Sequence, residues 1–215
     1  MHRVLPYSES DYEGIGKHNL LTSIWRRPRA TLVFILAKQP DEYISILFFL
    51  GGIARAVERA ISQQRSDKMS VGAMLLLAIV MGSTSGWITS SLYAWGMTIV
   101  GRWLGGTDDN DQFKTVLAWA QVPSIAGLLL LVPALVVFKG DSLREVRLAY
   151  PLLTHSVWLV VGLVEVGLGS WSVAILLKGV ALIQGFSTAR ALANILLPGS
   201  LVVAFIFLIA GLLQE

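Results

Sequence analysis

The sequence predicts an all-α, polytopic transmembrane helical bundle with five spans and an N-terminal amphipathic helix at the membrane surface. Of its 215 residues, 54% are hydrophobic and only 14% are charged, whereas an ordinary soluble domain carries about 25% charged residues. Four stretches of 24 or more residues contain at most one charged side chain each: 71–101, 115–138, 148–177 and 191–214. A helix crosses a bilayer core with about 20 mostly apolar residues, so each stretch is long enough to span.

The same composition excludes several other classes of protein. A water-soluble enzyme would need far more charge, and a membrane β-barrel would alternate apolar and polar residues along each strand, whereas residues 75–80 are apolar throughout. The chain has no cysteine, which excludes disulfides, thiol catalysis and thiolate metal sites. The net charge of +3 reflects topology and contact with anionic headgroups, and we expect no nucleic-acid partner.

The N-terminal region divides into a polar tail and a helix. Residues 1–20 are predicted to form a loose cytoplasmic tail, and residues 21–40 an amphipathic helix on the membrane surface. Pro28 suits the first turn of a helix, where its missing N–H costs nothing. The basic and aromatic side chains that would meet the headgroups are Trp25, Arg26, Arg27 and Arg29. The alternative is that these are ordinary charges flanking the first span.

The transmembrane domain is predicted to cover residues 41–213. Its five spans are expected at about 41–62, 71–104, 115–138, 153–177 and 198–213. The second would be about 51 Å long as a helix, at 1.5 Å per residue, so it must tilt, project or break near residues 82–86. The fourth contains Gly167 and Gly169, where it could bend. Six spans are therefore a second possibility.

Basic residues predict the orientation. With five spans, the side that holds the N-terminus receives ten lysines and arginines and the opposite side receives five. Because basic residues are enriched in cytoplasmic loops, we expect the N-terminus in the cytoplasm and the C-terminus outside.

Charged and amide side chains inside the spans form a candidate intramembrane polar site. An unpaired charge within a bilayer costs several kcal/mol, about 2.5 or more, so each such residue needs a partner, water or the interface. The candidates are Arg55, Glu58, Arg59, Gln121 and Glu165. The structural alternative is that Arg55 and Arg59 extend their side chains to the headgroups and form a local ion pair with Glu58. Glu165 would then be protonated or hydrogen-bonded to a neighbouring helix, which Gly162 and Gly169 would allow to come close.

The sequence also contains a glycine pair suited to helix packing and three histidines. Gly82 and Gly86 form a Gly-x-x-x-Gly pair suited to close helix packing, within the chain or at a dimer or ligand face. His2, His18 and His155 are scattered along the chain, and no metalloprotease or Walker motif is present. We therefore expect a protein that is not an enzyme and that needs no cofactor or metal.

The order of local motifs resembles the bacterial branch of the Yip1-domain membrane proteins. The segments that carry the resemblance are IWRRPRAT at 24–31, the Gly52 to Ala60 helix, GRWLGG at 101–106, AWAQVP at 118–123, and QGFSTARAL at 184–192. The resemblance implies five spans and a cytoplasmic N-terminus, in agreement with the charge count. The Asp-Leu-Tyr-Gly-Pro-type segment of eukaryotic members, which are linked to small GTPases, has no counterpart here.

These observations favour a non-enzymatic scaffold or adaptor in a bacterial cytoplasmic membrane, in contact with the lipid bilayer and with a protein partner or a second copy of itself. Its candidate cytoplasmic surface contains Trp25, Arg26, Arg27, Arg29, Arg102, Trp103, Gln184 and Arg190. One alternative is a transporter or channel for an ion or small solute, which would use the intramembrane polar site. A second alternative is a lipid-binding protein that uses the basic and aromatic surface.

Overall fold

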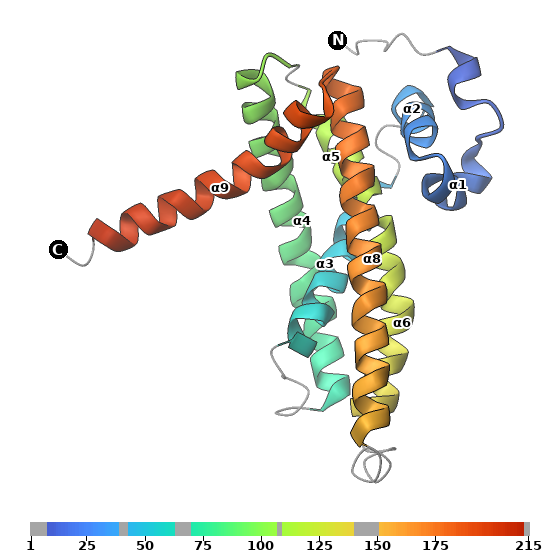
Figure 1. Cartoon of the computed structure of the whole chain (residues 1–215), viewed down its shortest axis with the longest axis vertical. Coiled ribbons are helices and arrows are strands. Elements are labelled where there is room, and N and C mark those ends of the chain that lie inside the picture. Colours follow the sequence, from blue (N-terminus) through green and yellow to red (C-terminus); the bar gives the residue numbers. More distant parts are fainter. Residues whose placement is uncertain (1–7, 39–42, 63–69, 107–108, 140–150, 213–215) are drawn as a thin grey trace. The chain divides into compact units, whose positions relative to one another are not determined.

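The computed structural model describes residues 8–38, 43–62, 70–106, 109–139 and 151–212, and within these ranges it contains helices and turns but no strand (Figure 1). The all-helical prediction is confirmed. In chain order the helices are η1 (Glu9–Tyr12), η2 (Lys17–Asn19), α1 (Leu20–Arg26), α2 (Pro28–Lys38), α3 (Ile44–Ser62), α4 (Val71–Trp103), α5 (Asn110–Ala120), α6 (Val122–Lys139), α8 (Pro151–Gln184) and α9 (Thr188–Leu212).

Three helical stretches are long and apolar enough to cross a membrane. They are Val71–Trp103, Asn110–Ala134 and His155–Gln184, with mean hydropathies of 1.8, 1.9 and 2.0. The predicted first span corresponds to α3, which carries three charged side chains, and the predicted fifth lies within α9, whose apolar stretch Thr188–Ala204 is shorter. The chain is therefore a helical membrane protein.

The helix boundaries correct several expectations. α4 is continuous through residues 82–86 and α8 through Gly167 and Gly169, so the breaks that would have given six spans do not occur in these helices. α9 begins at Thr188, ten residues before the predicted fifth span, and contains Pro198 in its interior. The third predicted span is interrupted at Gln121, which forms a turn between α5 and α6.

The predicted N-terminal helix at 21–40 is two helices in the structure. Arg27 separates them with φ −132° and ψ 62°, because a residue that precedes proline is disfavoured in the α conformation. α2 then begins at Pro28 and buries the consecutive residues 32–35, so its apolar side chains do not form a single stripe. Residues 8–19 are not a loose tail, since the ring of Tyr12 packs edge-on against Phe34 with centroids 5.5 Å apart.

The chain forms two compact units. The first contains Met1–Glu42, Ser90–Trp119 and Ala174–Glu215, and the second contains Tyr43–Thr89 and Ala120–Val173. The long helices α4 and α8 each contribute to both units.

Four helices build the core of the second unit. Val57 of α3, Ala78 of α4, Leu131 and Ala134 of α6, and Val161 of α8 form one buried apolar cluster. Two of these five side chains are alanines, which lets the helix backbones come near one another.

Glycines bring α3 and α4 into backbone contact in the second unit. A methyl group built on Gly52 would overlap the carbonyl oxygen of Gly82, and one built on Gly86 would overlap the Cα of Gly52. A methyl on Gly82 would lie 2.8 Å from the Cβ of Ala56. The structure therefore places the Gly-x-x-x-Gly pair of α4 against small residues of α3.

Helices α2, α5 and α8 meet in the first unit. A methyl built on Gly179 of α8 would overlap a methyl of Val116 on α5 and lie 3.1 Å from Leu32 Cδ1 on α2. Gly179 therefore fixes where α2 lies on α8.

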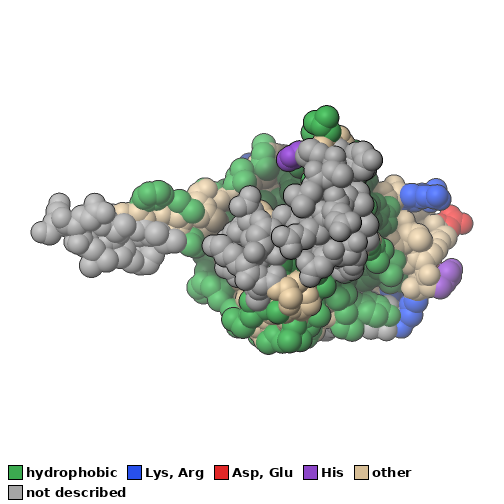
Figure 2. Space-filling view, turned by 90° about the horizontal axis from the view of Figure 1, so that it is seen from below, with side chains coloured by type: hydrophobic (Ala, Val, Ile, Leu, Met, Phe, Trp, Pro, Cys, Tyr) green, Lys and Arg blue, Asp and Glu red, His purple; other side chains and the backbone are tan. Residues whose placement is uncertain are grey.

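Large apolar side chains remain exposed along the long helices. On the face shown in Figure 2, hydrophobic side chains cover much of the surface that is not grey. Examples are Leu76, Leu92, Leu159, Leu163 and Val166. A water-soluble protein rarely exposes so many large apolar side chains on neighbouring turns, and here they form the surface that contacts the lipid bilayer.

Candidate functional site

The candidate site residues fall into two groups that coincide with the two units. All five intramembrane candidates belong to the second unit, and all eight candidates for the cytoplasmic surface belong to the first.

A hydrogen bond joins Arg55 to Gln121 in the second unit. The Nη1 of Arg55, on α3, donates to the Oε1 of Gln121 over 2.9 Å. Gln121 is buried, and Gly51 clears the space for it, because a methyl built on Gly51 would lie 2.8 Å from Gln121 Cδ. The turn between α5 and α6 thus carries an amide whose oxygen accepts a bond from a guanidinium.

Two glutamates extend this group toward α8. Glu58 lies one helical turn after Arg55 and interacts electrostatically with both Arg55 and Glu165. The Oε1 of Glu165 is buried and has no hydrogen-bond partner among the described residues. Arg59 is exposed. The arrangement combines one guanidinium with two carboxylates, and a carboxylate is a group that can bind a cation or exchange a proton.

The close neighbour of Glu165 is a different glycine from the two that were expected. No described atom lies within 4 Å of a methyl built on Gly162 or Gly169. A methyl on Gly127 of α6, in contrast, would lie 2.6 Å from both carboxylate oxygens of Glu165. The expectation failed because spacing along α8 does not tell which face of the helix meets its neighbour.

Ser124 and Ser172 belong to the same unit and were missed by the sequence analysis. Their hydroxyl groups share a hydrogen bond of 3.0 Å between α6 and α8. The available signal was a hydroxyl side chain within each of two apolar stretches, one turn after Gln121 and two turns after Glu165.

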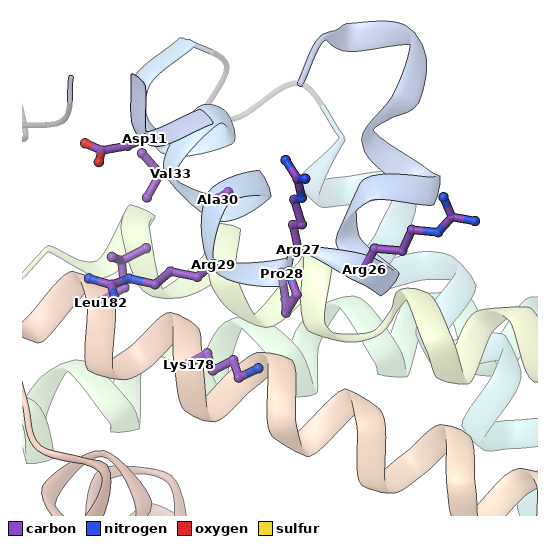
Figure 3. A pocket seen from close by; sticks show the side chains of 9 residues that line it. All are labelled: Asp11, Arg26, Arg27, Pro28, Arg29, Ala30, Val33, Lys178 and Leu182. Carbon is purple, nitrogen blue, oxygen red and sulfur yellow. The ribbon is translucent and has the colours of Figure 1, made fainter. Parts of the chain in front are cut away.

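An open cavity of about 720 Å³ lies in the first unit (Figure 3). Arg26 at the end of α1, Arg27 in the connection and Arg29 in α2 line it, together with Lys178 of α8. Asp11 is the acidic residue of this lining, and the remaining lining residues are Pro28, Ala30, Val33 and Leu182. The structure therefore brings three of the predicted surface arginines together around one opening.

The other predicted surface residues lie near the ends of α4, α8 and α9. Arg102 and Arg190 are exposed, Trp103 is 67% exposed, and Trp25 is half-buried. Gln184 is buried, at 8% exposure, which corrects its expected place on the surface. The reason is that Gly185 turns the chain with φ 66° and leaves the Gln184 amide against Gly106, where a methyl group would overlap it.

Polar side chains also lie between α4 and α9 of the first unit, and sequence reasoning did not identify them. The hydroxyl of Tyr93 donates to the backbone carbonyl of Ile195. Asn194 is fully buried, and its amide nitrogen and oxygen have no hydrogen-bond partner among the described residues. A methyl built on Gly101 would lie 2.8 Å from Asn194 Nδ2. A single asparagine in an apolar stretch was the available signal.

Comparison with known proteins gives one family match. Residues 22–211 match the model of the Yip1 domain. No curated protein and no solved structure matches the chain. Among the described residues, no group of three or more histidine, aspartate or glutamate side chains is placed to hold a metal ion.

Proposed function

The chain belongs to the Yip1 domain family, and from this membership we propose that it is a non-enzymatic, five-span scaffold or adaptor of a bacterial cytoplasmic membrane. Its N-terminus would lie in the cytoplasm.

Contacts within the first unit support four crossings before α9. A methyl on Gly106, after α4, would lie 2.7 Å from the Phe186 ring, after α8, so both connections belong to one side of the membrane. Leu32 of α2 packs against Gly179, near the end of α8, on that same side. Since α2 and Gly106 lie on the same side, the chain between them must cross the membrane an even number of times. α4 supplies one of these crossings, and α3 has to supply the other. With α9 as the last, the count is five.

Length and charge agree with this topology. The 19 residues of α3 make a helix of roughly 28 Å, close to the thickness of the hydrocarbon core. Its charged side chains lie toward the end of the helix, where long stems reach the headgroups. The side that holds α2, Gly106 and Phe186 carries the ten basic residues, which supports its assignment to the cytoplasm.

One observation carries the proposed scaffold role. The first unit brings together three segments that are far apart in the sequence: α2, residues 101–106 at the end of α4, and residues 184–191. Contacts at Gly106 and Gly179 hold them. The ends of these helices expose Trp103, Arg102 and Arg190. Tryptophan and arginine are the residue types that contribute most to protein interfaces, and here a packed framework holds them in place.

Crosslinking from single cysteines tests the scaffold role. The chain has no native cysteine, so W103C and R190C can each carry a benzophenone maleimide as the only label. We expect irradiation of membranes to give a discrete adduct with a protein partner or with a second copy. L163C, at an exposed apolar position of α8, is the matched control and should give none. Monomeric protein without adducts from either test position contradicts the proposal.

A second candidate function, transport of an ion or a small solute, is favoured by Glu165. Its buried Oε1 has no partner among the described residues, and a permeant cation or proton would supply one. Proteoliposomes loaded with a pH or ion reporter should then show a flux that E165Q abolishes and R102Q, at an exposed charge outside the polar site, preserves. An E165Q flux equal to that of the wild type removes the main residue of this candidate.

A further inference from the structure

We infer that the basic cavity of the first unit binds the phosphate group of an anionic phospholipid. The cavity is the one lined by Arg26, Arg27, Arg29 and Lys178. This inference goes beyond the proposed scaffold role and does not depend on it.

The charge of the lining points to a phosphate ligand. The lining carries three guanidinium groups and one ammonium group but one carboxylate, that of Asp11, so these five groups sum to a charge of +3. The Oδ2 of Asp11 also accepts a hydrogen bond of 2.9 Å from the backbone N–H of Ser8, the residue that precedes η1. Guanidinium groups bind phosphate oxygens through paired N–H donors, and a lysine adds a point charge.

The backbone at the start of α2 adds to the positive potential of these side chains. Pro28 is the first residue of α2, and the first intrahelical bond runs from Thr31 N–H to the carbonyl of Arg27, at 3.0 Å. The N–H groups of Arg29 and Ala30 therefore belong to the first turn, which has no preceding helical carbonyl to bond with. The positive end of the helix dipole lies at the same place, and both Pro28 and Ala30 line the cavity.

Packing beneath the cavity holds the basic residues in place. Leu32 of α2 contacts α8 at Gly179, the residue that follows Lys178. Arg29 lies one helical turn before Leu32, so the same contact sets its position along α8. Figure 3 shows the side chain of Arg29 extending toward Leu182, with Lys178 lower in the view, below Arg29 and Pro28. All four basic residues are exposed to solvent.

The apolar part of the lining favours a lipid over free phosphate. Val33, Ala30 and Leu182 line the cavity beside the cations and offer a surface to the glycerol and the first acyl carbons. Lys178 lies six residues before the end of the apolar helix α8, roughly 9 Å along its axis. A lysine at this depth extends its ammonium to the headgroup layer, where lipid phosphates lie.

Lipid binding to the full chain in neutral detergent tests the inference. Native mass spectrometry would compare a phosphatidylglycerol with the phosphatidylcholine of the same acyl chains. We expect the double variant R29Q/K178Q to bind phosphatidylglycerol at least about tenfold more weakly than wild type, since two charge-assisted contacts are lost. R29K/K178R, which keeps both charges, should retain most of the affinity. K38Q/K114Q removes two lysines outside the cavity and is the control for net charge; it should change the affinity by less than about twofold.

The possible outcomes separate the sources of the phosphate group. Preference for phosphatidylglycerol that depends on Arg29 and Lys178 supports the inference. Inorganic phosphate that displaces the lipid at equal concentration supports a phosphate site and reassigns its source to the free ion. Equal binding of the two lipids, or equal losses in R29Q/K178Q and K38Q/K114Q, overturns the inference. Unchanged thermal unfolding of R29Q/K178Q shows that a loss of binding is not a loss of fold.

Discussion

Gly52, Gly82 and Gly86 allow α3 and α4 to approach until backbone meets backbone in the second unit. At such a contact the space for one added methyl group exists only if a whole helix moves. The consequence is that a conservative change to alanine acts on the packing of two helices rather than on one side chain.

We predict that G52A lowers the free energy of unfolding by about 2 kcal/mol, the usual cost of overpacking a closely packed contact. The matched control is G162A on α8, because no described atom lies within 4 Å of a methyl built there. That variant should be neutral or gain up to about 1 kcal/mol from helix propensity. Titration with a denaturing detergent in mixed micelles measures both. Equal stability of G52A and G162A contradicts the account of this contact.

The bond between Arg55 and Gln121 leads to a second prediction at the level of single residues. Q121A removes the oxygen that accepts from Arg55 Nη1 and should lower the free energy of unfolding by about 1.5 to 3 kcal/mol, as expected for a hydrogen bond to a charged group. Q121E keeps an acceptor at the same place and should lose less. The same titration measures both variants, and a Q121A protein as stable as wild type would show that this bond contributes nothing.

Short helices at the N-terminus depend on a long helix far along the chain. α2 lies against α8 because Gly179 leaves room for Leu32 and for Val116 of α5. The connection between α1 and α2 carries arginines on the exposed side. The local stability of this element can therefore be measured by cleavage at those arginines.

We predict that G179L displaces α2 and raises the rate of tryptic cleavage at Arg26 and Arg29. Proteolysis follows the population of the locally opened state, so a loss of about 1.4 kcal/mol would give a tenfold faster rate. G199L is the control, because no described atom lies within 4 Å of a methyl built on Gly199 of α9. Cleavage at the wild-type rate in G179L would mean that Leu32 does not anchor α2 at this site.

Over the whole molecule, the apolar helices could be predicted from the sequence and most of their contacts could not. Long apolar stretches with at most one charged residue identify α4 and α8 directly, because a bilayer demands them. The separation of α1 from α2 was also predictable, since Pro28 disfavours a helical Arg27. The burial of Gln184 depends on Gly106, 78 residues earlier, and no local pattern indicates such a pair.

For the candidate sites, too, one part could be predicted from the sequence and another part could not. The residue types of both groups could be found from the sequence, because charge is rare in these apolar stretches. Their neighbours could not: Gly127 beside Glu165, Ser172 beside Ser124, and Lys178 beside the N-terminal arginines. These neighbours come from other helices, and helical spacing alone does not tell which faces meet.

The central proposal is that the N-terminal helices and the turn after α8 share the cytoplasmic side of a membrane that the chain crosses five times. The most direct measurement is labelling of single cysteines by an impermeant maleimide in intact cells and after permeabilisation. We predict that S10C and S187C react only after permeabilisation and that S70C, before α4, reacts in intact cells. Labelling of S10C and S187C from opposite sides, or of S70C from the same side as both, would contradict the claim.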